Sequence, residues 1–293
     1  MTFINPKTDY AFKKIFGSSD SKAILISFLN AMIYDGNPTI EDLEIIDPNL
    51  PPRVEGLKDS SLDVKAQLAD GTLVIIEMQV LNVESFGQRI LYNAAKTYAF
   101  QLQKGEGYRM LKPVIALTIT DFEMFKNSNN LISRFVYKEE ASNLPYPDND
   151  IKLIFVELPK FTKEVDQLET LADKWIYFMK YAITITEVPP VMDSVPEIHK
   201  AFGIANEVNL SPDELANIER QEMFIYDQQG TIIKAVKDAV QEARQEARQE
   251  GRQEGKQEEK RAIARQLLDR LDDETISQTT GLSIEDVRNL RSQ

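Results

Sequence analysis

The chain has 293 residues, and its 34 Lys and Arg against 47 Asp and Glu give a net charge of −13. This charge argues against a protein that coats nucleic acid through bulk positive charge. The absence of Cys and the single His, His199, exclude disulfides, thiol nucleophiles and two-histidine metal sites, so a catalytic metal would need oxygen ligands, as Mg²⁺ or Mn²⁺ does. Without a signal peptide or an apolar run of ~18 residues, we expect a cytoplasmic protein with no membrane partner.

Two helices are predicted near the start of the chain. Phe12, Ile15 and Phe16 recur at helical spacing after Thr8 and Asp9, either of which could cap the helix. A second helical pattern covers residues 24–32, and a Pro-rich loop follows it at 47–52.

A β-hairpin is the next predicted feature, because β-rich runs at 62–68 and 72–80 flank an Asp-Gly pair at 70–71. The sequence allows two strand registers for this hairpin. A two-residue turn would place Asp63 opposite Met78 and turn Glu77 to the other face, whereas a three-residue loop at 69–71 would place Asp63 opposite Glu77.

We predict the three-residue loop, since it pairs Val64 with Ile76 and Leu62 with Met78 on one apolar face.

Three polar residues, Asp63, Glu77 and Gln79, interrupt these apolar strands. A buried carboxylate costs several kcal/mol unless it is paired or bound to metal. In the predicted register the two opposed Cβ atoms would be about 4.5–5.5 Å apart, close enough for both carboxylates to bind one cation. The alternative is that both side chains lie at solvated strand ends.

The remaining elements of this region are a helix at 85–103, apolar strands at 113–120 and 151–158, and a helix that begins near 168. The order predicts an α+β (or α/β) fold with a mixed central sheet flanked by helices. The helix at 85–103 is the start of a basic stretch that contains five cationic side chains and one acidic residue. The cationic side chains could bind phosphate: Arg89, Lys96, Lys104, Arg109 and Lys112.

The C-terminal part of the chain changes in composition. We predict a domain at 1–185, an acidic helical linker at 186–230 and a helical tail at 231–293. The tail contains five tetrads, QEAR, QEAR, QEGR, QEGK and QEEK, with no leucine-zipper seam through them. Their separate acidic and basic stripes favour homo-oligomer formation through 231–293; the alternative is a solvated helix. Two short helices around residues 280–283 follow the tetrads.

Five segments resemble the recombination-promoting nucleases, a transposase-like family of the PD-(D/E)XK nuclease superfamily. They cover about residues 5–180 in order: KTDYAFKKIFG, FLNAMI, LDVKAQLADGTLVIIEMQ, FGQRILYNAAKTYAFQLQKGEGY and VELPKF. The resemblance implies a restriction-endonuclease-like core and Mg²⁺- or Mn²⁺-dependent cleavage of double-stranded DNA, linked to recombination or mobile elements. By position, Asp63 and Glu77 would be the metal ligands, with the Met78 carbonyl as a third.

Gln79 stands where the superfamily pattern has Lys, although Gln is usual in this subfamily. An amide can orient a water but supplies no charge, so we hypothesise that Lys65, on the same predicted face, supplies it. Asp9 could approach the site from the first helix or simply cap that helix. Arg89 and Lys96 are predicted to contact DNA; for Arg89 the alternative is a surface ion pair.

The sequence therefore predicts a metal-dependent DNA endonuclease. The replaced lysine and the acidic surface leave an alternative, a non-catalytic DNA- or protein-binding module on a decayed nuclease fold.

Overall fold

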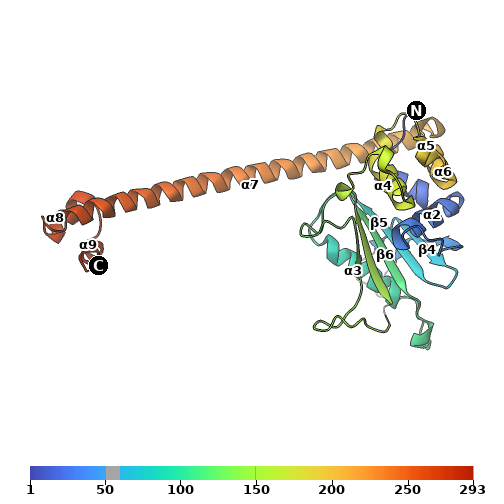
Figure 1. Cartoon of the computed structure of the whole chain (residues 1–293), viewed down its shortest axis with the longest axis horizontal. Coiled ribbons are helices and arrows are strands. Elements are labelled where there is room, and N and C mark those ends of the chain that lie inside the picture. Colours follow the sequence, from blue (N-terminus) through green and yellow to red (C-terminus); the bar gives the residue numbers. More distant parts are fainter. Residues whose placement is uncertain (51–59, 149, 293) are drawn as a thin grey trace. The chain divides into compact units, whose positions relative to one another are not determined.

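The structure is a computed structural model that describes residues 1–50, 60–148 and 150–292. It divides into two compact units, an N-terminal unit, Met1–Asp227, and a C-terminal unit, Gln228–Gln293. The N-terminal unit contains a six-stranded mixed sheet flanked by helices, and the C-terminal unit is helical (Figure 1). The predicted α+β class with a mixed central sheet is confirmed. The division of the chain by function at residues 185 and 230 stays a prediction.

The central sheet has the strand order β1-β4-β5-β6-β8-β7. β5 pairs parallel with β6, and β6 parallel with β8, whereas the outer pairs are antiparallel. The strand bounds are β1 (Leu43–Ile46), β4 (Val64–Leu68), β5 (Leu73–Gln79), β6 (Val114–Thr120), β7 (Ile132–Phe135) and β8 (Ile151–Glu157), and a separate pair is formed by β2 (Asn49–Leu50) and β3 (Ser60–Ser61).

Helices cover both faces of this sheet (Figure 1). One face packs on α3, and the other packs on α1, α2, α4 and α6 through a larger apolar core. In the described part of the chain, no helix combines the length and apolarity needed to cross a membrane. The α-helices are α1 (Asp9–Phe16), α2 (Lys22–Ile33), α3 (Phe86–Ala99), α4 (Leu171–Tyr181), α5 (Pro190–Asp193), α6 (Pro196–Ala205), α7 (Pro212–Leu267), α8 (Asp273–Thr280) and α9 (Ile284–Arg291).

The first helix begins where the sequence predicts. The Thr8 hydroxyl accepts a hydrogen bond from the Ala11 N–H group, so Thr8, and not Asp9, is the N-cap. Phe12, Ile15 and Phe16 are fully buried beneath it. Asp9 is therefore free of the capping role and presents its carboxylate from the first turn.

The β4–β5 hairpin has the predicted register. Val64 lies opposite Ile76 and Lys65 opposite Ile75. The Leu68 N–H group donates to the Thr72 carbonyl at 2.9 Å, which leaves a three-residue loop at 69–71. Gly71 closes this loop with φ +89, a conformation that other residues rarely adopt.

The prediction for Leu62 is wrong. Leu62 does not share the Val64 face but is buried in the core under α3, because the chain bends at Asp63. Its N–H group donates to the Pro48 carbonyl at 3.2 Å, beside the β2–β3 pair. The bend ends β4 at Val64 and turns Asp63 out of the ladder.

Other differences lie at the edges of predicted elements. The edge strands β1 and β7 were not predicted, since each is only four residues long. α3 ends at Ala99 rather than near 103. Helices α5 and α6, in the segment predicted to be a linker, bury Met192 and Phe202 in the main core of the N-terminal unit.

The C-terminal unit ends in the predicted helical hairpin. Gly281 adopts φ +66 after α8, and the Ser283 hydroxyl caps α9 by accepting from the Asp286 N–H group at 3.0 Å. A small apolar core holds α8 and α9 to the end of α7: Ala264, Ile276, Leu282 and Val287.

Candidate functional site

A cleft of about 990 Å³ opens where β5 ends and α3 begins. Six of the eight predicted site residues line it: Asp9, Asp63, Glu77, Met78, Gln79 and Arg89. Among the described residues, its further lining comes from β3, from the β5–α3 loop and from the exposed face of α3. The structure thus brings one end of the hairpin, the first turn of α1 and the first half of α3 to one place.

Asp63 enters the cleft because it leaves the hairpin ladder. In the observed register the hydrogen-bonded pairs are even-numbered, so Met78 would ordinarily donate to the Leu62 carbonyl. Instead the Met78 N–H group donates to Asp63 Oδ2 at 2.7 Å. The carboxylate replaces a main-chain acceptor, and this bond fixes it beside the end of β5.

The Asp63 carboxyl is held in an unfavourable environment for its charge. Burial raises its pKa to about 7, and the nearby Asp9 and Glu77 carboxylates act in the same direction. The Met78 hydrogen bond and the Lys13 ammonium oppose this rise. Lys13 Nζ lies 2.7 Å from Asp9 but 4.0 Å from Asp63 Oδ1, so Asp63 is poorly neutralised.

Glu77 approaches the same cleft from β5 and is held by α3. Its side chain is 8% exposed and points to the α3 face, as the register requires. Asn93 Nδ2 donates to Glu77 Oε1 at 2.6 Å, and Arg89 Nη2 lies 3.4 Å from Oε2. One carboxylate oxygen is firmly bonded and the other has only a long contact with a cation.

Gln79 lies two residues along β5 on the same face. Its Oε1 accepts from Arg89 Nη2 at 2.7 Å, and its Nε2 donates to the Leu81 carbonyl at 2.7 Å. Both ends of the amide are therefore fixed, and Arg89 bridges Gln79 and Glu77. The guanidinium also stacks over the Phe86 ring at 5.2 Å, while about half of its side chain stays exposed.

Two predicted residues do not reach the cleft. Lys65 is not among the described residues that line it, and the charged group that influences its ammonium is Asp47, near β1; burial lowers its pKa. Lys96 is 4% exposed, and its ammonium donates to the Leu50 carbonyl at 2.6 Å. The Lys96 ammonium is thus directed at the main chain of Leu50, which is not among the described residues that line the cleft, and the roles predicted for Lys65 and Lys96 stay predictions.

Two cleft residues, Asn93 and Tyr92, escaped the sequence analysis as site residues, as did Lys13, which is not among the described lining residues but forms an ion pair with Asp9. Lys13 is one helical turn from Asp9, a spacing that could have linked the two. Asn93 and Tyr92 lie one turn after Arg89, so the helical period that places Arg89 in the cleft also places them there. Tyr92 is 42% exposed.

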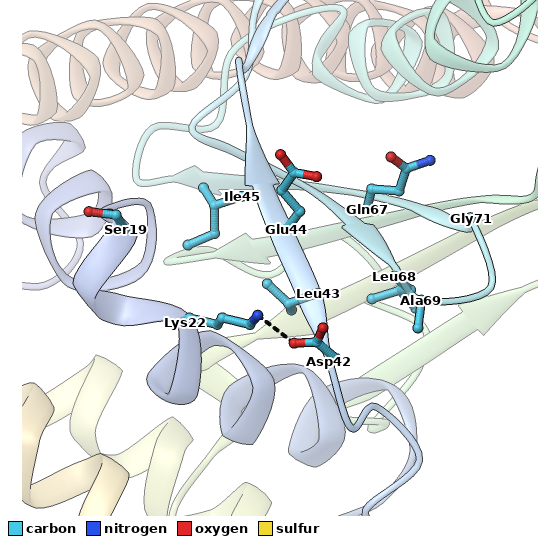
Figure 2. Close-up of a pocket in the computed structure, with 10 residues that line it drawn as sticks. All are labelled: Ser19, Lys22, Asp42, Leu43, Glu44, Ile45, Gln67, Leu68, Ala69 and Gly71. Atoms are coloured by element: carbon cyan, nitrogen blue, oxygen red, sulfur yellow. Dashed lines mark ion pairs between the residues drawn. The ribbon is translucent and has the colours of Figure 1, made fainter.

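A second cavity, of about 620 Å³, lies at the β1 edge of the sheet (Figure 2). Its charged pair, Lys22 and Asp42, forms an ion pair that lowers the pKa of Asp42. None of the predicted site residues is among the described residues that line it. The Asp42 carboxylate is exposed and closely paired with Lys22, unlike the carboxylate of Asp63.

The donor set of the cleft suits a hard divalent cation. The carboxylate of Asp63 comes from the residue before β4 and that of Glu77 from β5, and among the described residues the nearest Lys or Arg nitrogen lies 4.0 Å from Asp63 and 3.4 Å from Glu77. No group of three or more His, Cys, Asp or Glu side chains able to hold a metal occurs in the described residues. Such a cation would therefore rest on two carboxylates, with carbonyl oxygen and water completing its shell, as Mg²⁺ tolerates.

Asp63→Asn should stabilise the metal-free protein in a pH-dependent way. A carboxyl whose folded-state pKa is raised from 3.8 to about 7 loses its contribution to stability as the pH rises through that range. The gain of the variant should be small near pH 4, grow to at most about 4 kcal/mol near pH 7, and then level off. Thermal unfolding in EDTA measures it.

Asp42→Asn is the control for this series, since the pKa of its exposed carboxyl is lowered by Lys22 and no such gain follows. A stability difference for Asp63→Asn that does not change between pH 4 and pH 8 would contradict the burial of charge at Asp63.

A family model described as PD-(D/E)XK nuclease family transposase matches residues 6–235, which is most of the chain and includes every cleft residue named above. No curated protein and no solved structure matches the chain.

Proposed function

Since this chain belongs to the PD-(D/E)XK nuclease family transposases, we propose that its cleft binds a divalent cation, Mg²⁺ or Mn²⁺, and hydrolyses phosphodiester bonds in double-stranded DNA. The observation that carries the proposal is the meeting of Asp63 and Glu77, from neighbouring strands, in one partly buried cleft. The family membership also supports a role in recombination or the movement of mobile elements.

The charge of the cleft supports a need for a cation. Among the described lining residues are four carboxylates, Asp9, Asp63, Glu77 and Glu84, and one guanidinium, that of Arg89. A phosphodiester entering this cleft would be repelled, because like charges at short range raise the free energy of the complex. A divalent cation between the strands would reverse that balance.

We assign the ligand roles to Asp63 and Glu77, with the Met78 carbonyl as a third candidate. Asp63 is held in place by the Met78 N–H group, and Glu77 by Asn93, so neither carboxylate needs to reorganise to meet a cation. When bound, the cation would supply Lewis-acid stabilisation of the scissile phosphate and a more acidic water.

Two cationic side chains could stabilise charge on the phosphate. Arg89, half exposed and bonded to Gln79, can follow the substrate while Gln79 keeps its second bond to Leu81. Lys13, and not Lys65, takes the position from which positive charge can reach Asp63 and the substrate. Gln79, whose amide is fixed at both ends, would orient a water but supply no charge.

The alternative is a binding module without catalysis. The Gln at position 79 and the two-carboxylate donor set are the observations that favour it. The two functions differ in one respect that is easily measured, since only the enzyme breaks a phosphodiester bond.

We also propose self-association through residues 231–293. On α7 the apolar side chains Ile233, Val236 and Val240 are 67%, 58% and 47% exposed at spacings of three and four, which places them on one helix face. Exposed apolar residues that share a face mark interaction surfaces. A second copy of the same helix would cover them.

Asp63→Ala and Glu77→Ala should each reduce Mg²⁺-dependent nicking of supercoiled plasmid to the level seen with EDTA, because one carboxylate alone holds the cation weakly. Gel electrophoresis of the plasmid measures the nicked fraction. Asp42→Ala, which removes a carboxylate from the second cavity, should leave nicking unchanged. Equal nicking by native protein and Asp63→Ala would reject this site, and no nicking by native protein would favour the binding module.

Lys13→Ala should slow nicking by about 10²-fold, the typical cost of removing one charge-stabilising group, with a smaller effect on Mn²⁺ affinity. Lys65→Ala is the matched control: it removes the same side chain at a position whose charged neighbour is Asp47 rather than a cleft carboxylate, and the rate should not change. The measurement is the single-turnover nicking rate at saturating Mg²⁺. A loss of rate in Lys65→Ala with none in Lys13→Ala would reverse the assignment.

The double variant Val236→Glu/Val240→Glu should lower the sedimentation mass of the full chain to that of one copy, since charge would enter the apolar face. Val208→Glu, at a residue 85% exposed in the N-terminal unit, is the control. If the native chain already sediments as a single copy across the concentration range, this part of the proposal fails.

A further inference from the structure

We propose that Asn93 is a positioning residue that fixes Glu77 for cation binding by holding its Oε1, so that Oε2, which has only a long contact with Arg89 among the described residues, can bind the cation. The inference rests on the proposed function, since it takes Glu77 to be a ligand. It concerns a residue to which neither the sequence motifs nor the family match gives a role.

Asn93 is built into the floor of the cleft. Its side chain is 1% exposed, and it projects from α3 one turn after Arg89. Nδ2 donates to Glu77 Oε1 at 2.6 Å, a short charge-assisted hydrogen bond. An amide that cannot rotate toward water fixes the rotamer of the carboxylate it binds.

The oxygen atom of the Asn93 amide supports this positioning role. Asn93 Oδ1 is buried and has no hydrogen-bond partner among the described residues. A buried acceptor without a partner is unfavourable, so burial of this amide is compensated chiefly through the bond to Glu77.

Asn30 provides the contrast within the same unit. It is also buried, but its Nδ2 donates to the Ile40 carbonyl at 2.9 Å and its Oδ1 accepts from the Ile40 N–H group at 2.8 Å. Asn30 ties two stretches of main chain together with both ends of its amide. Among the described residues, the Asn93 side chain binds no main chain, and the Glu77 carboxylate is its hydrogen-bond partner.

The two contacts to Glu77 differ in how easily they are released. Asn93 is buried and close to Oε1, whereas Arg89 is half exposed and 3.4 Å from Oε2. Arg89 also has its shorter bond, 2.7 Å, to Gln79. Oε2 is therefore the oxygen that can turn to a cation, while Asn93 keeps Oε1 in place.

The test is Mn²⁺ binding to the full chain, measured by calorimetry at pH 8, above the Asp63 pKa of about 7. Asn93→Leu keeps the volume of the side chain but cannot donate, and Asn93→Ala removes both. Both variants should weaken Mn²⁺ binding by about 10- to 100-fold, the usual cost of losing a group that orients a ligand.

Thr97→Val is the matched control. Thr97 lies one turn further along α3, is 3% exposed, and its hydroxyl also has no hydrogen-bond partner among the described residues, so the substitution breaks no described bond. Its Mn²⁺ affinity should stay within about twofold of native. Melting temperatures of all variants separate loss of binding from loss of folding.

Native affinity in a folded Asn93→Leu variant would overturn the proposal. Absence of Mn²⁺ binding by the native chain would instead overturn the proposed function. If the variants do not fold, the native chain decides: on titration with diamagnetic Mg²⁺, the Asn93 side-chain amide resonances should shift and stay protected from exchange. Amide resonances that do not respond to Mg²⁺ would contradict the positioning role.

Discussion

The Met78 N–H group donates to the Asp63 carboxylate in the position where a hairpin would normally use the main-chain carbonyl of Leu62. This exchange of acceptors has two consequences. It ends the β4–β5 ladder at Val64 and lets Leu62 enter the core under α3, and it leaves Asp63 beside Glu77 at the mouth of the cleft. The rest of the site depends on it, because α3 positions Glu77 through Asn93, whereas Asp63 is held by the Met78 N–H group.

The carboxylates of Asp63 and Glu77 are only weakly neutralised by neighbouring basic side chains. Lys13 pairs closely with Asp9 and only distantly with Asp63, and Arg89 pairs closely with Gln79 and only distantly with Glu77. Asp63 and Glu77, the proposed metal ligands, thus each have a basic side chain nearby but no close ion pair with it. The two basic side chains partly neutralise the carboxylates when no metal is bound. Because each also has another partner, both can move away when a metal binds.

Much of this site could be read from the sequence, because its main determinants are local. The Asp-Gly pair and the alternation of apolar residues define the hairpin register, and the register alone places Glu77 and Gln79 on one face. Thr8 and Asp9 were the two possible N-caps of α1. Because Thr8 caps the helix, Asp9 is free to line the cleft. These features depend on residues close together in the chain.

The side chains that lie elsewhere than the sequence predicts are those with contacts to distant segments. Lys96 has the spacing of a surface residue on α3, but its ammonium binds the Leu50 carbonyl 46 residues away, which no local pattern reveals. Lys65 does project from the predicted face, yet it lies further from the end of the hairpin, near Asp47. Asn93 was missed for the same reason, since its partner Glu77 lies on another element.

Anomalous diffraction from crystals of the full chain soaked in Mn²⁺ tests the central claim most directly. If the two carboxylates bind one cation, a single strong peak is expected between Asp63 and Glu77, with Arg89 turned away from Glu77. A peak at another place, or none at a Mn²⁺ concentration that supports DNA cleavage, would contradict it.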